Sequence, residues 1–320
     1  MHIPDGMLDT KTFSTLWGGA AASIGYASYW VRKNFNEKKI VLMAVLGALI
    51  FALQMLNFPV AGGTSGHFVG AALAGILLGS WPGVIVMTAV LLIQALFFGD
   101  GGITTLGANI INMAVIGVFI GPFIYHLITR FSSNLSLKIV GAAIGSWLSV
   151  VLSAAAVAIE LWISGSAQFF VALSSMVFWY AIIGVGEAII TAGIVVYIAK
   201  VRPEIVEEGH QQMQKSWVSV SVVLSVITVI AVGLSFLASS YPDGLEFVYF
   251  NMGIGSTSVS PTSLLPAPLS NYLVSGITNN VASGIAAGII GIILTGLVLL
   301  AVARLLARHR EKQAASDVSD

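Results

Sequence analysis

The sequence predicts an all-α integral membrane protein with about nine transmembrane helices. Hydrophobic residues make up 57% of the 320-residue chain, charged residues make up only 9%, and the mean hydropathy is +0.94. Soluble domains carry about 25% charged residues, so this composition indicates a surface that faces lipid. Helices are expected because an open sheet edge has no hydrogen-bond partner in the bilayer, and the apolar segments lack the alternation of barrel strands.

Nine apolar segments are candidates for crossing the bilayer. They lie at about 12–31, 40–57, 66–80, 83–98, 107–129, 138–161, 168–199, 217–238 and 282–307. The segment 66–80 is short, with about 22 Å of helix for ~30 Å of hydrocarbon. We nevertheless expect it to cross, in a locally thin or sheltered position, because the distribution of positive charge requires nine crossings.

Basic residues set the expected orientation. With nine crossings, the basic groups within residues 32–39, 130–138, 200–215 and 304–312 all fall on one side of the membrane, and only Lys11 falls on the other. Short cytoplasmic connections carry an excess of Lys and Arg. The sequence therefore predicts a multi-pass protein of the plasma (inner) membrane, with its N-terminus outside and its C-terminus in the cytoplasm.

The polar stretch 203–216 predicts a cytoplasmic linker between two modules. Seven predicted spans precede this stretch and two follow it. The expected parts are a seven-helix membrane domain (1–202), the linker, a two-helix hairpin module with a long outer loop at 239–281 (217–310), and a polar, disordered tail (311–320).

Several classes of function are disfavoured by what the sequence lacks. The chain contains no cysteine, which excludes thiolate metal sites and disulfides. It contains neither a P-loop nor an H-E-x-x-H motif, so we expect no ATPase or zinc-protease activity from this chain. Acidic and basic residues balance at 14 each, which gives no indication of a nucleic-acid partner.

The dipeptide Met1-His2 could chelate a metal ion. The α-amine, the His2 amide nitrogen and the imidazole Nδ1 would close a five-membered and a six-membered ring, and a planar nitrogen set suits Ni(II) or Cu(II). The turn-forming sequence Pro4-Asp5-Gly6 would pre-bend this leader. Taken alone, a chance histidine at a frayed terminus is the better interpretation of the dipeptide.

His67 is the expected fourth ligand. Of the five histidines, only His2 and His67 are predicted to lie on the outer side, and His67 follows a glycine-rich run at 62–66 that allows close backbone approach. The alternative is a helix-start histidine that hydrogen-bonds a loop carbonyl. An outward Met1-His2 favours the metal ligand.

Other polar residues are expected beside the ligands. Asp100, in the outer loop Gly99-Asp100-Gly101-Gly102, could accept a hydrogen bond from a metal-bound imidazole or could be a solvated loop acid. The full set of candidate neighbours is Asp5, Ser65, Asp100 and Asn109. Polar groups on the apolar spans, namely Gln54, Gln94, Asn109 and Asn112, are more often interhelical hydrogen-bonding residues than ligands.

Two acidic residues and one serine suggest alternative functions. Glu187, near the middle of a predicted span, is costly there unless paired or protonated, and could be the ion or proton site of a secondary transporter or channel. Glu160 lies near the outer end of another span. Gly63-Thr64-Ser65-Gly66 matches the motif of intramembrane serine proteases, but His67 is too close in sequence to act as the base, and His126 is predicted on the opposite side.

Three pairs of glycines at four-residue spacing predict close helix contacts. They are Gly75/Gly79, Gly117/Gly121 and Gly141/Gly145. Packing within the chain is the favoured interpretation, and a contact face for another membrane subunit is the alternative.

Taken together, the motifs resemble a known family. Residues 1–6 (Met-His-Ile-Pro-Asp-Gly), 59–67 (Pro-Val-Ala-Gly-Gly-Thr-Ser-Gly-His) and 99–102 are similar to the substrate-capture component, of the NikM/CbiM type, of nickel/cobalt energy-coupling-factor transporters. The resemblance covers about residues 1–202. The outer-loop sequence Pro242-Asp243-Gly244-Leu245-Glu246 resembles the small NikN/CbiN-type accessory subunit, here fused to the first module.

The resemblance implies a membrane protein without its own ATPase. Such a component works with a transmembrane coupling subunit and cytoplasmic ATP-binding-cassette ATPases, and takes Ni(II) or Co(II) as substrate, with no organic cofactor. The implied ligands are Met1, His2 and His67 at the outer face. Asp5, where the cobalt members more often carry Glu, and the fusion both favour nickel.

Overall fold

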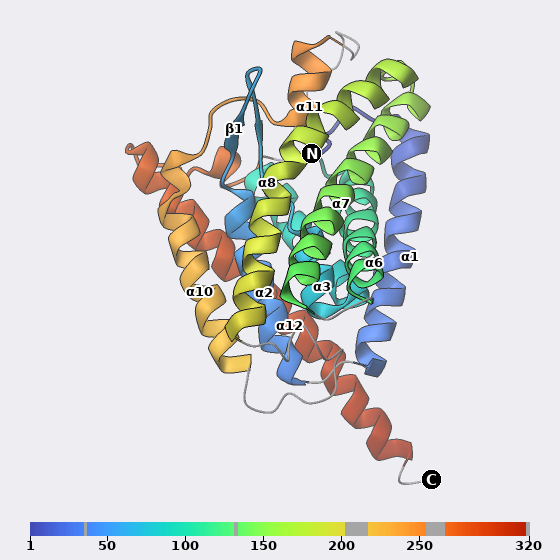
Figure 1. Cartoon of the computed structure of the whole chain (residues 1–320), viewed down its shortest axis with the longest axis vertical. Helices are drawn as coiled ribbons and strands as arrows, with labels where there is room; N and C mark the ends of the chain where they lie inside the picture. The colour runs from blue at the N-terminus through green and yellow to red at the C-terminus, as the bar shows by residue number, and fades with distance from the viewer. Residues whose placement is uncertain (35–36, 131–133, 202–216, 254–265, 318–320) are drawn as a thin grey trace.

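The structure, a computed structural model, describes residues 1–34, 37–130, 134–201, 217–253 and 266–317. It confirms an all-α membrane protein: the chain forms an elongated helical bundle (Figure 1). The strand β1 (Phe58–Val60), the short helix α11 (Gly244–Glu246) and the N-terminus share one end, and the last turns of α12 (Asn280–Asp317) lie at the other (Figure 1).

Helices account for nearly all of the first module. They are α1 (Thr10–Asn34), α2 (Glu37–Gln54), α3 (Ala71–Leu78), α4 (Ser80–Ile93), α5 (Leu106–Asn109), α6 (Gly117–Thr129), α7 (Leu135–Ile163) and α8 (Phe169–Val201). Two π-helical segments, η1 (Gln94–Phe98) and η2 (Ile110–Ile116), continue α4 and join α5 to α6. Single π turns inside helices are frequent at functional sites.

The second module contains two long helices and a loop with short helical turns. Its elements are α10 (Trp217–Gly233), η3 (Ser235–Leu237), α11 (Gly244–Glu246), η4 (Phe247–Asn251), η5 (Ser270–Tyr272) and α12 (Asn280–Asp317). Both α10 and α12 pack against α2. The predicted linker lies outside the described residues, and α12 is helical as far as Asp317, within the stretch predicted as a disordered tail.

Each of the nine predicted segments contains a helix. Within the described residues, five helical runs are long and apolar enough to cross a membrane: Ser80–Phe98, Leu106–Thr129, Leu135–Ile163, Phe169–Lys200 and Asn280–Leu306. Ile40–Gln54 and Leu224–Gly233 are shorter apolar helices. The exact number of crossings and the orientation therefore stay predictions.

The prediction of one helix over 66–80 is wrong. Helix α3 has only eight residues. It follows Gly70, whose φ of 79° is left-handed, and it ends at Gly79, whose φ of 91° interrupts the helix before α4. All residues of α3 except Ile76 are buried, and α3 packs against α6 and α7. A short helix is tolerated here because the surrounding helices, and not lipid, cover it.

A small β-hairpin, absent from the prediction, precedes α3. Strands β1 (Phe58–Val60) and β2 (Thr64–Gly66) pair antiparallel, with Pro59 opposite Ser65. The loop of the second module adds to the other edge of β2, since the Ser65 amide donates to the Pro242 carbonyl at 2.8 Å. The strand that leads into His67 is thus held on both sides.

The glycine pairs pack inside the chain. A β-carbon on Gly121 would lie 2.4 Å from the Cβ and 2.6 Å from the Cα of Ala72 in α3, and one on Gly145 would lie 2.6 Å from the Gly121 carbonyl oxygen. These contacts support the interpretation that the glycines serve internal helix packing.

Replacement of Gly121 by alanine should therefore destabilise the protein. Overpacking of a filled site costs about 1–3 kcal/mol, so Gly121→Ala should lower the Tm measured in detergent. Gly193→Ala is the matched control, because a β-carbon on Gly193 meets nothing within 4 Å. Equal Tm values for the two variants would contradict this packing account.

Candidate metal centre

The N-terminal leader is buried and held by side chains of the first module. Met1 is only 1% exposed. The Ile3 amide donates to Asn109 Oδ1 at 2.8 Å, and Asn109 Nδ2 donates to the Ile3 carbonyl at 3.1 Å. Thr105 Oγ1 also donates to this carbonyl at 2.5 Å. Asn109 thus binds both backbone groups of one residue, as a neighbouring strand would.

Asp5 attaches the leader to the loop that precedes α5. Its Oδ1 accepts from the Thr104 amide at 2.8 Å and from the Thr104 hydroxyl at 2.6 Å. A β-carbon on Gly102 would lie 2.3 Å from the Asp5 amide nitrogen, so only glycine permits this approach. Asp5 and Asn109 therefore position the leader.

The structure brings the three predicted ligands together. The α-amine nitrogen of Met1 lies 3.1 Å from His67 Nε2. The His2 and His67 rings are stacked, with centroids 5.3 Å apart and planes at 19°. His67 Nδ1 lies 3.3 Å from its neighbour's carbonyl, Phe68 O. A proton on Nδ1 would satisfy that carbonyl and leave the Nε2 lone pair facing the amine, the usual arrangement for a metal-binding histidine.

His2 contacts an acceptor at each ring nitrogen. Nδ1 lies 3.1 Å from Asp100 Oδ1, and Nε2 lies 3.2 Å from Gln94 Oε1. Burial lowers the pKa of His2 to about 4, although Asp100 opposes the shift. His2 is therefore neutral near pH 7, the state that binds metal ions. Asp100 thus faces Nδ1, the nitrogen that the predicted chelate uses, and Gln94 faces Nε2.

Asp243 is a site residue that the sequence reasoning missed. The Met1 ammonium donates to Asp243 Oδ2, and the Tyr180 hydroxyl donates to the same oxygen at 3.2 Å. His67 Nε2 lies 3.6 Å from Asp243 Oδ1. Burial by itself raises the pKa of Asp243, but the terminal ammonium and His67 outweigh it and hold this pKa well below its usual range. The sequence offered one indication of this role, because Asp243 lies in a loop predicted to be on the same side of the membrane as Met1.

Ser65 binds the loop of the second module through its hydroxyl group. Its hydroxyl donates to the Tyr241 carbonyl at 2.8 Å, and the Thr64 hydroxyl donates to the Pro242 carbonyl at 3.1 Å. The Ser65 hydroxyl is thus committed to a backbone carbonyl, and nothing in its surroundings favours the protease interpretation.

Glu187 holds the backbone directly after His67. Its two carboxylate oxygens accept from the amides of Val69 at 2.7 Å and Gly70 at 2.9 Å. Glu160 accepts from Asn112 Nδ2 at 2.7 Å. Both oxygens of Glu187 are therefore occupied by structural hydrogen bonds, which argues against the ion-site interpretation.

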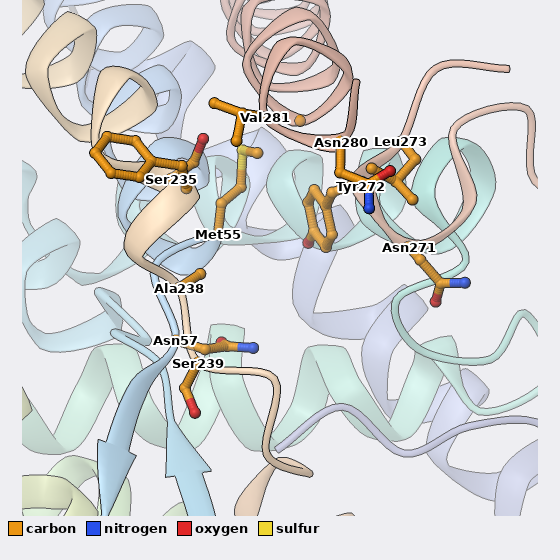
Figure 2. Close-up of a pocket in the computed structure, with 12 residues that line it drawn as sticks. Met55, Asn57, Ser235, Ala238, Ser239, Asn271, Tyr272, Leu273, Asn280 and Val281 are labelled. Atoms are coloured by element: carbon orange, nitrogen blue, oxygen red, sulfur yellow. The ribbon is translucent and has the colours of Figure 1, made fainter. Parts of the chain in front are cut away.

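The candidate centre opens into a cavity of about 520 Å³ between the two modules. It is lined by residues of the first module, including His2, His67 and Asp100, and by residues of the second, including Asp243 and Glu246. A neighbouring cavity of about 230 Å³ shares Met55, Asn57, Ser239, Asn271 and Tyr272 with it. Figure 2 shows the Tyr272 ring of this second cavity between Met55 and Asn271.

Side chains alone do not form a metal site here. Among the residues that the structure describes, no group of three or more His, Asp or Glu side chains could hold a metal ion. A metal centre at this position would therefore need a donor besides these side chains.

Comparison with known proteins gives the family. Residues 2–205 match the family described as CbiM, the cobalt uptake substrate-specific transmembrane region. The chain belongs to the CbiM family. Residues 216–308 match the PDGLE domain, and the five residues that spell this name, 242–246, include Asp243.

Relatives with both parts are described as nickel transport proteins. The chain is 38% identical to a putative fused nickel transport protein NikMN of Archaeoglobus fulgidus, over 88% of this chain and 95% of that protein. It is 30% identical to the fused nickel transport protein NikMN of Rhodobacter capsulatus, over 97% of this chain and 99% of that protein. A cobalt transport protein CbiM of Sorangium cellulosum is 31% identical over 65% of this chain and 95% of its own length.

A solved structure shares the architecture of the CbiM part. A crystal structure described as a transition metal transporter is 37% identical and superposes with a TM-score of 0.57, covering 63% of this chain and 93% of that one. This CbiM-family chain is thus a membrane protein of a metal-transport family.

Loss of the Asp243 carboxylate should loosen the α-amine. Hydrogen bonds to charged groups contribute about 1.5–3 kcal/mol, and 1.4 kcal/mol is a factor of ten. Asp243→Asn should therefore raise the rate at which an acylating reagent labels the α-amine by about tenfold, measured by mass spectrometry of the N-terminal peptide. Asp9→Asn is the control, because Asp9 is exposed and Asn can still cap α1. Unchanged labelling in Asp243→Asn would show that the ion pair does not restrain the amine.

Proposed function

We propose that this chain is the substrate-capture component of an ATP-driven uptake transporter of the energy-coupling-factor type, and that it binds Ni(II), or alternatively Co(II), at its outer face. One observation carries the proposal: the buried α-amine lies 3.1 Å from His67 Nε2, and the His67 ring is stacked on the His2 ring. An amine and imidazoles in such proximity are good donors for late divalent transition metals.

The metal ion is cargo, and the donors that would hold it are nitrogens. The α-amine of Met1, the amide and Nδ1 of His2, and Nε2 of His67 would complete a four-nitrogen set. The amide of His2 must give up its proton and the amine must be uncharged, so binding releases protons and weakens as the pH falls.

Three features support nickel over cobalt as cargo. A planar nitrogen set suits Ni(II), the fused relatives are described as nickel transport proteins, and Asp5 stands in the leader. Cobalt remains the alternative because the family's description names cobalt uptake.

Transport requires partners in this proposal. The sequence carries no P-loop, so a transmembrane coupling subunit and cytoplasmic ATP-binding-cassette ATPases would supply the energy. The N-terminus and the last turns of α12 lie at opposite ends of the bundle (Figure 1), as expected if metal enters at the outer face and the C-terminus lies in the cytoplasm.

Adding one residue before Met1 should abolish nickel binding. The extension moves the α-amine out of register with His67 and turns the Met1 nitrogen into an amide. We expect the native protein to bind one equivalent of Ni(II) in calorimetry and the extended protein to bind none. Addition of the same residue at the C-terminus is the control. Full affinity in the extended protein would exclude the α-amine as a ligand.

His67→Ala should also abolish high-affinity binding, since it removes the only predicted ligand outside the leader. His126→Ala is the matched control, because His126 lies near the C-terminal end of α6 (Gly117–Thr129) and is not among the residues of the site. Equal nickel affinity of His67→Ala and the wild-type protein would reject His67 as a ligand.

A further inference from the structure

We propose that Gln54 and Gln94 form a hydrogen-bond relay that fixes His2 as the Nε2–H tautomer and leaves its Nδ1 as the metal-binding nitrogen. The inference rests on the proposed metal site and deepens it, because it assigns two positioning residues and the nitrogen they select. Neither glutamine touches the metal in this account.

The relay starts at a backbone carbonyl, which can only accept a hydrogen bond. Gln54 Nε2 lies 2.6 Å from the Val69 carbonyl oxygen, so this end of Gln54 must be its NH₂ group. The opposite orientation would bring two oxygens to that distance. The carbonyl oxygen of Gln54 therefore points at Gln94.

The second glutamine is oriented by the first. Gln94 Nε2 donates to Gln54 Oε1 at 2.7 Å and to the Tyr272 hydroxyl at 3.2 Å. Its two N–H groups are thereby used, and its Oε1 faces His2 Nε2 at 3.2 Å. An amide oxygen can only accept, so the proton belongs on Nε2 of His2.

Asp100 offers a competing acceptor on the other side of the ring. Its Oδ1 lies 3.1 Å from His2 Nδ1, while its Oδ2 accepts from the Tyr272 hydroxyl at 2.6 Å. A neutral imidazole carries one N–H and can satisfy only one of the two sides.

Burial decides between these two acceptors. The Asp100 side chain is 30% exposed, so water can reach it, whereas Gln94 is fully buried at 0% exposure. Leaving a buried acceptor unpaired is costly, whereas water and the Tyr272 hydroxyl can hydrogen-bond to the partly exposed Asp100 carboxylate. The Nε2–H tautomer is therefore favoured, and the Nδ1 lone pair then lies beside a carboxylate, an arrangement that a bound cation would stabilise.

The position of the relay explains why it has two members. Gln54 is the last residue of α2, and Gln94 begins the π-helical segment η1. The relay thus connects the backbone two residues after His67 to the ring of His2. One set of hydrogen bonds thus orients the His2 ring relative to the backbone that follows His67. Loss of partners that orient a ligand costs about 10–100-fold in metal affinity.

The test measures the His2 tautomer and nickel binding in the same protein. In full-length protein labelled with ¹⁵N-histidine in nanodiscs, without metal, the ¹⁵N shifts of His2, assigned by comparison with His2→Ala, should report Nε2–H. Gln94→Leu should shift His2 toward Nδ1–H and lower the Ni(II) affinity in calorimetry at least tenfold. Gln54→Leu should act in the same direction, because it frees Gln94 to rotate.

Controls separate this proposal from the site itself. Gln168→Leu, an exposed glutamine of the same chain, should leave tautomer and affinity unchanged. Failure of the wild-type protein to bind nickel would overturn the proposed function. The tautomer of His2, measured without metal, would still test the hydrogen-bond relay. An Nδ1–H tautomer in the wild-type protein, a measurement that needs neither glutamine variant, would overturn the relay, as would wild-type affinity in Gln94→Leu.

Discussion

The buried α-amine of Met1 is the constraint on which the rest of the site depends. Moving a charged amine out of water is expensive unless it is paired and hydrogen-bonded. Here it lies between His67 and the carboxylate of Asp243, in a residue that is 1% exposed. Since Asp243 belongs to the PDGLE region and His67 to the CbiM region, pairing this one group joins the two parts of the chain at the candidate centre.

Irregular backbone around the site is stabilised by hydrogen bonds from distant segments, most of them made by polar side chains. Asn109 binds both backbone groups of Ile3, Glu187 binds the amides of Val69 and Gly70, and the carbonyl of Pro242 accepts from the amide of Ser65. In a bundle that faces lipid, non-helical backbone is tolerated only where protein or a water-filled cavity surrounds it. These side chains therefore allow an extended leader and a short helix to lie among long helices.

The sequence predicted the features that depend on composition and long apolar runs. Nine segments each contain a helix, and sorting histidines by side of the membrane identified His67 as the partner of Met1 and His2. The hairpin, the eight-residue α3 and Asp243 were missed for a common physical reason. Each is stabilised by a contact with residues far apart in the chain, such as Val69 with Glu187 or, on the outer edge of the hairpin, Ser65 with Pro242. No local spacing encodes such a contact.

The coordination of bound nickel tests the central claim most directly. Nickel K-edge X-ray absorption of full-length protein loaded with one equivalent of Ni(II), with its native Met1, would report the number, type and arrangement of donor atoms. The account predicts four nitrogen donors in a plane, the geometry that Ni(II) favours with such ligands. A six-coordinate centre rich in oxygen would contradict it, because carboxylates and water would then hold the metal in place of the terminal nitrogens.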